Sequence, residues 1–153
     1  MRLMRATALS LVLLTFPPLA FADTHAEVVN LFASMSAALS DVPLDASTIE
    51  LNAENAAAKF MKAFDRKWPE YDVLKRDIKA LVLDSRIASS IDFVKDEGND
   101  SKRSVDVDWY LEDANNLKAG AVRRRQIVHC ELAKQGKHWR IVSLSPISFF
   151  AEK

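Results

Sequence analysis

In the first half of the chain, apolar residues recur every three or four positions, which is the spacing of a helix with one buried stripe. The first such segment opens with Thr24 and Glu27, spaced as in a capping box, and stops before Pro43. A second segment starts at Asn52, and Pro69 suits the first turn of a third. The pattern therefore predicts three helices with these buried stripes: Val28, Leu31, Phe32, Met35 and Leu39; Phe60, Met61 and Phe64; and Tyr71, Leu74, Ile78, Leu81 and Val82.

Beyond residue 84 the period changes to two. Apolar and polar residues then alternate, as they do in strands with one buried side. The run from Lys134 to Lys137 is typical of a tight hairpin turn, and Pro146 lies near the end of the last strand, where a missing backbone donor is tolerated. We predict four strands, over residues 87–94, 104–112, 121–133 and 138–150.

Three helices followed by four antiparallel strands predict an α+β fold, with the N-terminal helices packed on one side of a single sheet. The alternation gives that sheet one apolar side and one charged side. If Gln135 and Gly136 form a two-residue loop, Lys134 pairs with Lys137. The pairs that follow on the apolar side are Leu132 with Trp139, Cys130 with Ile141, and Val128 with Ser143.

The first 22 residues have the pattern of an export signal. Arg2 and Arg5 precede an uncharged, mostly apolar run over residues 6–16, and small residues end the segment at Ala22. The run is shorter than the roughly 20 apolar residues that a spanning helix needs. We therefore expect cleavage after Ala22, which leaves one domain over residues 23–153 in the periplasm or outside the cell, with no stable membrane anchor.

Charge and cysteine content narrow the classes of function. Without Arg2 and Arg5, a chain with 21 basic and 21 acidic residues becomes mildly acidic, which gives no electrostatic reason to expect nucleic acid as a partner. The single cysteine, Cys130, cannot form an internal disulfide, so stability has to come from packing. Three scattered histidines and three glycines form no metal-ligand or nucleotide-binding motif, and we expect neither metal nor cofactor.

Four segments of the chain resemble a known superfamily: FMKAFDRKWPEY, SSIDFVKDEGND, VDVDWYLED and RRRQIVHCELAKQGKHWRIVSLSPISFF. They are similar to exported bacterial members of the nuclear-transport-factor-2-like (NTF2-like, SnoaL-like) superfamily, and the W-R-I-V-S-L run after the G-K turn is the most specific part. The resemblance implies a cone, in which a strongly curved sheet wraps the helices and leaves a pocket. Members include isomerases, dehydratases, ligand binders and adaptors, so the resemblance implies no particular chemistry.

A candidate ligand site lies on the apolar side of the predicted sheet, which becomes polar toward one end. Its residues are Arg124, Gln126, Ser143 and Trp109. A mostly apolar cavity with a few polar groups is typical of small-molecule sites, and Arg124 is suited to anchor an anionic or carbonyl group. The alternative is that Arg124 and Gln126 lie past the helices, where they are solvated at the rim of the sheet.

The other side of the predicted sheet carries charged residues that ion pairs explain. Glu131 falls opposite Arg140, and Asp108 is expected near Arg125. This side is either a solvated face or, as the superfamily resemblance suggests, the surface of a homodimer or a partner complex. Its remaining polar members are Asp106, Tyr110, Arg123 and His129.

No catalytic residue is predicted. Asp92 and Asp106 are expected opposite each other, but on the charged side, where solvent keeps both ionised. His129 points away from the cone, and His25 and His138 lie at a helix start and beside a turn. We expect an exported non-catalytic domain that binds a small ligand in the cone or a protein partner. The alternatives are an isomerase or lyase with a buried carboxylate, and a dimeric adaptor whose cone is filled by side chains.

Overall fold

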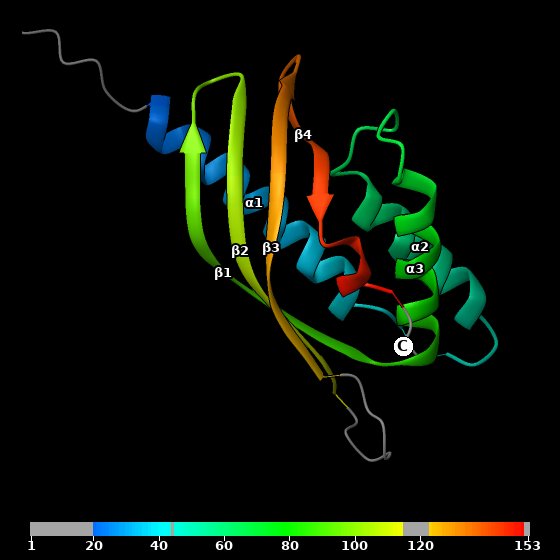
Figure 1. Ribbon diagram of the computed structural model, residues 1–153. Coiled ribbons are helices and arrows are strands. Elements are labelled where there is room, and N and C mark those ends of the chain that lie inside the picture. Colours follow the sequence, from blue (N-terminus) through cyan, green and yellow to red (C-terminus); the bar gives the residue numbers. More distant parts are fainter. Residues whose placement is uncertain (1–19, 44, 115–122, 152–153) are drawn as a thin grey trace, which may run out of the picture.

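Three helices precede four strands in the computed structural model, which describes residues 20–43, 45–114 and 123–151 (Figure 1). This order confirms the predicted α+β class. The fourth strand is shorter than predicted, because the chain turns at Pro146 and returns Phe149 and Phe150 to the core. The elements are α1 (Ala20–Ser40), α2 (Ile49–Met61), α3 (Tyr71–Asp84), β1 (Ile87–Gly98), β2 (Lys102–Asp113), β3 (Arg123–Gln135), β4 (His138–Ser145) and the short 3-10 helix η1 (Ile147–Phe149).

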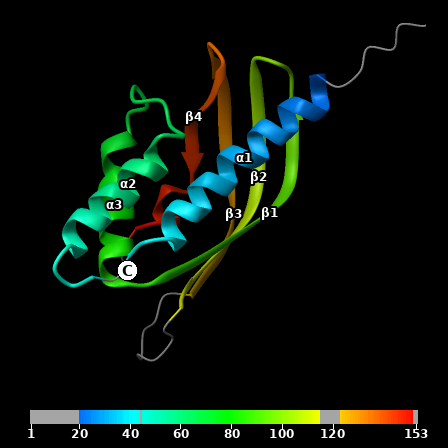
Figure 2. The ribbon, with the colours of Figure 1, turned by 180° about the vertical axis from the view of Figure 1, so that it is seen from behind.

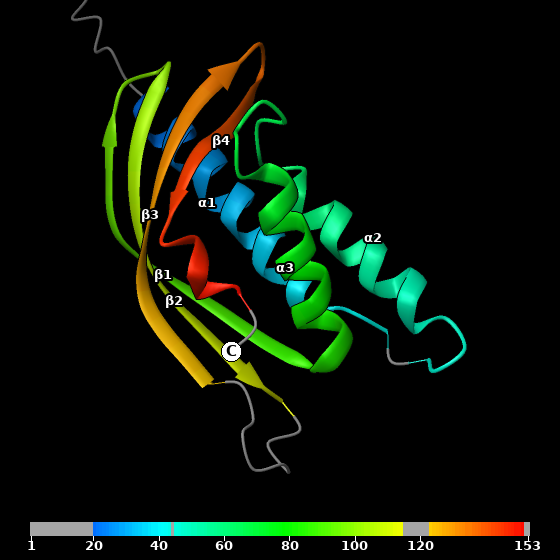
Figure 3. The same ribbon diagram turned by 45° about the vertical axis from the view of Figure 1, so that its right-hand side comes forward.

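The strands form one antiparallel sheet in the order β1-β2-β3-β4. The sheet is strongly curved, and Figure 3 shows all three helices on its concave side. From behind, α1 crosses β1 and β2 at a slant, while α2 and α3 lie side by side beyond β4 (Figure 2). The helices therefore cover one face of the sheet and leave the other face open.

The concave side holds the core. Along β2, Val105, Val107, Trp109 and Leu111 are fully buried, and the residues between them are partly exposed, so the predicted period of two is confirmed. The indole of Trp109 lies at the centre of an aromatic cluster, with ring centroids 5.0 Å from Phe150 and 6.1 Å from Phe60. The burial of these apolar side chains is the main contribution to the stability of the fold.

The predicted register of the last hairpin is wrong by one residue at the turn. Gln135 pairs with His138, so Gly136 and Lys137 form the loop, and Lys134 pairs with Trp139. The reason is the backbone of Gly136, whose φ of 63° is a conformation that glycine adopts without steric cost.

A bulge in β4 shifts the register a second time. Leu132 pairs with Ile141 but Glu131 pairs with Ser143, so one extra residue is inserted in β4. After the bulge Leu144, and not Ser143, faces the core beside Cys130. A similar irregularity in β1 lies between Phe93 and Lys95.

Two predictions concern segments outside the described residues. The export signal falls on residues 1–22, of which only the backbone of residues 20–22, at the start of α1, is described. The start of the predicted third strand, at residues 121 and 122, is not described either. None of the helices in the described part of the chain is long and apolar enough to cross a bilayer.

Candidate functional site

The four residues predicted to bind a ligand do not meet in one cavity. Trp109 is fully buried, and its indole N–H donates to the Ser89 hydroxyl at 2.9 Å. Gln126 lies directly opposite Trp109 but is exposed, because β3 extends past the helices at this end. Ser143 pairs with Glu131 and so lies on the outer face, contrary to the predicted register.

Arg124 is partly buried, and its Nη1 donates to the main-chain oxygen of Phe149 at 2.7 Å. Burial lowers the pKa of its guanidinium from the ordinary value. Arg124 and Gln126 together line a depression of about 540 Å³ at the rim of the sheet, to which Ser148 and Phe149 also contribute. Two of the four predicted residues are therefore brought together at the rim, and ligand binding there stays a prediction.

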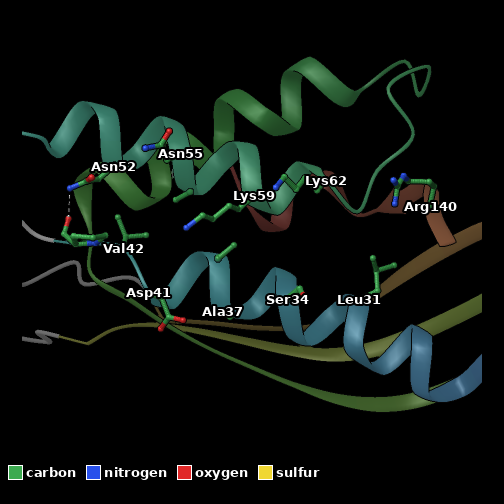
Figure 4. Close-up of a pocket in the computed structure, with 13 residues that line it drawn as sticks. Leu31, Ser34, Ala37, Asp41, Val42, Asn52, Asn55, Lys59, Lys62 and Arg140 are labelled. Atoms are coloured by element: carbon green, nitrogen blue, oxygen red, sulfur yellow. Dashed lines mark hydrogen bonds between the residues drawn. The ribbon is translucent and has the colours of Figure 1, made fainter. Parts of the chain in front are cut away.

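A larger cleft of about 660 Å³ lies between α1 and α2, where the sequence indicated no site (Figure 4). The large side chains with which α1 and α2 pack into the core differ from the side chains that line the cleft. The buried residues of α1, such as Phe32 and Leu39, form part of the core beneath the helix, whereas the flanks that face the cleft carry small side chains. The apolar and small residues of this α1–α2 cleft are Leu31, Ser34, Ala37, Ala38, Val42, Pro43 and Ala56.

Three cations line the same cleft. Lys59 comes from the last turn of α2, Lys62 directly follows the end of α2, and Arg140 comes from β4. Figure 4 shows the Lys59 side chain extending from α2 into the space between the helices. Asn52, whose side-chain amide donates to the main-chain oxygen of Pro43 at 3.1 Å, ties the start of α2 to the loop after α1.

The lysines of the cleft have no acidic partner at ion-pair distance among the described residues. The lysines of α3 differ in this respect, because Lys79 contacts both Glu50 and Glu54 across the α2–α3 interface. One carboxylate, that of Asp41, also lines the α1–α2 cleft. The cleft therefore has an excess of positive charge beside an apolar wall.

The structure also contains a buried carboxylate that sequence reasoning missed. The Asp96 side chain is only 6% exposed; its oxygens contact Arg103 Nε at 2.6 Å and His25 Nδ1 at 2.5 Å. The irregularity near Val94 turns Asp96 toward the concave side, where it pairs with Val105. Because both oxygens are engaged, the geometry supports a structural role that fixes the start of α1 against the sheet.

On the outer face, Asp92 and Asp106 are not opposite each other as expected. Asp92 lies opposite Asp108, whereas Asp106 lies opposite Lys95, so the predicted register of the first hairpin is wrong. The expected contact of Asp108 with Arg125 is confirmed by three hydrogen bonds of 2.6 to 3.1 Å.

The expected pairing of Glu131 with Arg140 is wrong, since Arg140 lies opposite Ala133. His129 lies on this face as predicted, between Asp106 and Glu131.

Two further observations bear on chemistry. Burial strongly raises the pKa of the Cys130 thiol, which makes it a poor nucleophile at neutral pH. Among the residues described, no three His, Cys, Asp or Glu side chains are grouped so that they could hold a metal ion. The side chains that line the α1–α2 cleft supply cations, amides, a hydroxyl, the carboxylate of Asp41 and apolar contacts.

Solved structures of the same architecture place this geometry in a known fold. A protein of unknown function with a cystatin-like fold from Nostoc punctiforme PCC 73102 matches with a TM-score of 0.59 at 11% identity, over 80% of this chain and 89% of that chain. An NTF-2 like protein of unknown function from Shewanella oneidensis MR-1 matches with a TM-score of 0.57 at 10% identity, over 79% and 96%. The fold is NTF2-like.

A third protein supports the NTF2-like fold. It is a protein of unknown function from Mycobacterium tuberculosis, with a TM-score of 0.54 at 13% identity, over 80% of this chain and 72% of that chain. No family model and no curated protein matches the sequence. Identities this low show the NTF2-like fold alone, and function has to be argued from the site.

Proposed function

We propose that this chain is an exported, non-catalytic binding domain that takes an anionic ligand with an apolar part in the α1–α2 cleft. The observation that carries the proposal is the set of three cations, Lys59, Lys62 and Arg140, around a cleft with an apolar wall. A volume of about 660 Å³ is within the range of small-molecule sites. An anion bound there would gain charge-assisted hydrogen bonds that no carboxylate of the described residues now makes with the two lysines.

The centre of the cone is a weaker candidate than the cleft. Its aromatic residues are packed against one another. The only side-chain donor of Trp109, its indole N–H, already donates to the Ser89 hydroxyl. A ligand at the centre would have to displace buried side chains, whereas a ligand in the α1–α2 cleft displaces water. The α1–α2 cleft, on the helical side of the cone, is therefore the better candidate for the ligand.

Export is the second part of the proposal and rests on the order of basic, apolar and small residues before Ala22. Protein recovered from the periplasm or the medium of an expressing bacterium is expected to begin at Asp23 when its N-terminus is sequenced. Intact protein that starts at Met1 and stays in the cytoplasm would contradict export without touching the cleft.

The binding proposal is tested by calorimetry on the mature chain with octanoate, which combines a carboxylate with an apolar tail. We expect octanoate to bind and the neutral octanamide to bind at least about tenfold more weakly, because a charge-assisted hydrogen bond contributes roughly 1.5 to 3 kcal/mol. The double variant Lys59→Met and Lys62→Met is expected to abolish the preference for octanoate.

The matched control is the double variant Arg66→Met and Lys67→Met, which removes two exposed cations outside the cleft and should bind as the wild type does. Arg124→Ala separates the two candidate sites: retained octanoate binding supports the cleft, and lost binding supports the rim. Equal affinity for octanoate and octanamide would overturn the proposal.

A further inference from the structure

The N-terminus that export would create carries a histidine as its third residue. Cleavage after Ala22 leaves a chain that begins Asp23-Thr24-His25. Such a start offers a set of nitrogens that can surround a metal ion in one plane: the α-amine, the next two main-chain amide nitrogens and Nδ1 of the imidazole. Planar nitrogen sites of this kind suit Cu²⁺, which also heads the affinity order of the divalent first-row metals.

The position of the histidine decides whether the plane can close. Nitrogens of consecutive residues form fused chelate rings with the metal, and Nδ1 of a histidine closes the last ring with the amide nitrogen of its own residue. A histidine one position earlier or later cannot complete the same plane. Both amides must also carry a proton that can be released, and neither Thr24 nor His25 is a proline.

Removal of the signal also frees the two amides from the helix. In α1 the N–H groups of Thr24 and His25 donate four positions back, to the main-chain oxygens of residues 20 and 21. Cleavage after Ala22 removes both oxygens, and the first N–H groups of a helix have no acceptor within it. Loss of these two protons therefore breaks no hydrogen bond of the shortened helix.

The imidazole of His25 is accessible, and the nitrogen that copper needs is the one that contacts the sheet. The side chain is 50% exposed, and its Nδ1 contacts Asp96 Oδ2 at 2.5 Å, where the start of α1 lies beside the β1–β2 hairpin (Figure 2). Copper and Asp96 therefore compete for one atom. Release of His25 does not leave the buried carboxylate alone, because Arg103 Nε contacts its other oxygen at 2.6 Å.

The scattered histidines of the sequence predicted no metal site, because the amine that completes this one exists only after cleavage. In the described part of the chain, side chains by themselves form no group of three metal ligands. Of the other soft or nitrogen ligands, Cys130 is fully buried and His129 has both ring nitrogens engaged, by Asp106 and Glu131. The N-terminal nitrogens are therefore the best copper ligands that the chain offers.

We propose that the mature chain binds one Cu²⁺ ion at its N-terminus, through the α-amine of Asp23, the amide nitrogens of Thr24 and His25, and His25 Nδ1. Binding forms four Cu–N bonds, and the α-ammonium and the two amides each release a proton to the solvent. The inference rests on the export part of the proposed function, because an uncleaved chain has no free amine at Asp23. It does not depend on the α1–α2 cleft.

The test titrates Cu²⁺ into a chain released at Asp23 from a fusion protein by a protease that leaves no extra residue. We expect one equivalent to bind, with the visible absorption and EPR spectra of a planar four-nitrogen Cu²⁺ complex. The matched control carries one added glycine before Asp23, which makes His25 the fourth residue and changes no side chain. This control should lose the four-nitrogen spectra, as should His25→Ala, whereas His129→Gln should keep them.

Heat unfolding gives a second measurement. The four nitrogens lie in one plane only when residues 23–25 leave the helical conformation. The unfolded chain therefore binds copper without the cost of unwinding α1 or of displacing Asp96, and a ligand that prefers the unfolded state destabilises the fold. We expect one equivalent of Cu²⁺ to lower the Tm of the chain that begins at Asp23 and to leave the Tm of the glycine-extended chain unchanged.

The outcomes separate copper binding from export. Identical copper spectra for the two chains, or a rise in Tm for the chain that begins at Asp23, would overturn the site. Periplasmic protein that begins at Asp23 but lacks the four-nitrogen spectra leaves export standing and overturns this inference. Periplasmic protein that begins at another residue contradicts cleavage after Ala22, and the copper site falls with it.

Discussion

At the scale of single residues, Ser89 joins three elements through one hydroxyl. Its oxygen accepts from the buried indole of Trp109 on β2 and from the Ser36 hydroxyl on α1, at 2.9 and 2.7 Å. Its main-chain N–H donates to Ser40 Oγ at 3.1 Å. The alternation in the sequence places Ser89 on the buried side of β1 but gives no reason for a polar side chain there. The reason is tertiary, because the buried Trp109 N–H needs an acceptor.

We therefore expect Ser89→Ala to destabilise the fold by about 1 to 3 kcal/mol, because it leaves the Trp109 N–H buried without its acceptor. The control is Ser90→Ala, on the exposed side of the same strand, which should cost less than about 0.5 kcal/mol. Urea unfolding of both variants gives the free energies. Equal decreases in the free energy of unfolding would show that the Ser89 hydroxyl does not stabilise the fold through Trp109.

His129, on the outer face, is expected to make the stability of the fold depend on pH. Its pKa is raised above the ordinary 6.5, first by the hydrogen bond with Asp106 and further by Glu131, against a lowering from partial burial. A raised pKa in the folded state means that folding favours the protonated ring. The contribution to stability is fully present below the unfolded pKa and is lost as pH rises through the folded pKa.

The melting temperatures of the wild type and His129→Gln are therefore expected to differ most near pH 6 and to converge by about pH 9. Scanning fluorimetry across this range measures the difference. A gap that widens toward high pH would mean that the ring is neutral in the folded protein. The control variant is His138→Gln, which changes an exposed histidine beside the turn that has no acidic partner at ion-pair distance among the described residues.

At the scale of elements, the two hairpins depend on glycine to different degrees. Gly98, with φ of 140°, ends β1, and a Cβ there would lie 2.2 Å from the Lys102 oxygen and 2.8 Å from Arg103 Cα. Gly136, with φ of 63°, has nothing within 4 Å of the same position. Both glycines have a positive φ that other residues rarely adopt, but only at Gly98 is there also no space for a Cβ atom.

Gly98→Ala is expected to cost about 3 kcal/mol or more, because the clash is with main-chain atoms that cannot move without breaking the β1–β2 pairing. Gly136→Ala should cost about 1 to 2 kcal/mol, the ordinary cost of a left-handed residue. Urea unfolding of the two variants tests the order. If Gly136→Ala is the more harmful, the two turns do not have the described geometry.

At the scale of the whole molecule, the open face of the sheet is the surface on which we expect a second copy of the chain to bind. Its charges are largely paired with one another, as in Arg125 with Asp108 and Arg123 with Glu112. Ile127 stands among them with 47% of its surface exposed. A face with internally paired charges and a central apolar residue can associate without leaving single charges buried.

We accordingly expect the mature chain to be a homodimer through this face, with twice the chain mass in light scattering after size exclusion. Ile127→Lys should shift the protein to monomer, because it adds an unpaired charge to the contact. Leu51→Lys, at a similarly exposed apolar residue on α2, should leave the mass unchanged. A monomeric wild type would assign the open face to solvent.

The sequence by itself determined the element order, the helical stripes and the two-residue period of the sheet, because these patterns are local along the chain. The stripe residues Val28, Leu74 and Ile78 are fully buried, as are Val105 and Val107 on β2. The sequence also placed Asp108 beside Arg125 correctly. Each of these predictions needs only the spacing of neighbouring residues.

The tertiary structure decided the register and the candidate site. One inserted residue in β4 moves Ser143 to the outer face, and no sequence pattern marks that insertion. The α1–α2 cleft brings Lys59 and Lys62 together with Arg140, which lies far along the chain, and small residues such as Ser34, Ala37 and Ala56 line it. Contacts between distant segments depend on how whole helices and strands pack against one another. The periodicity of apolar residues along the chain does not specify that packing.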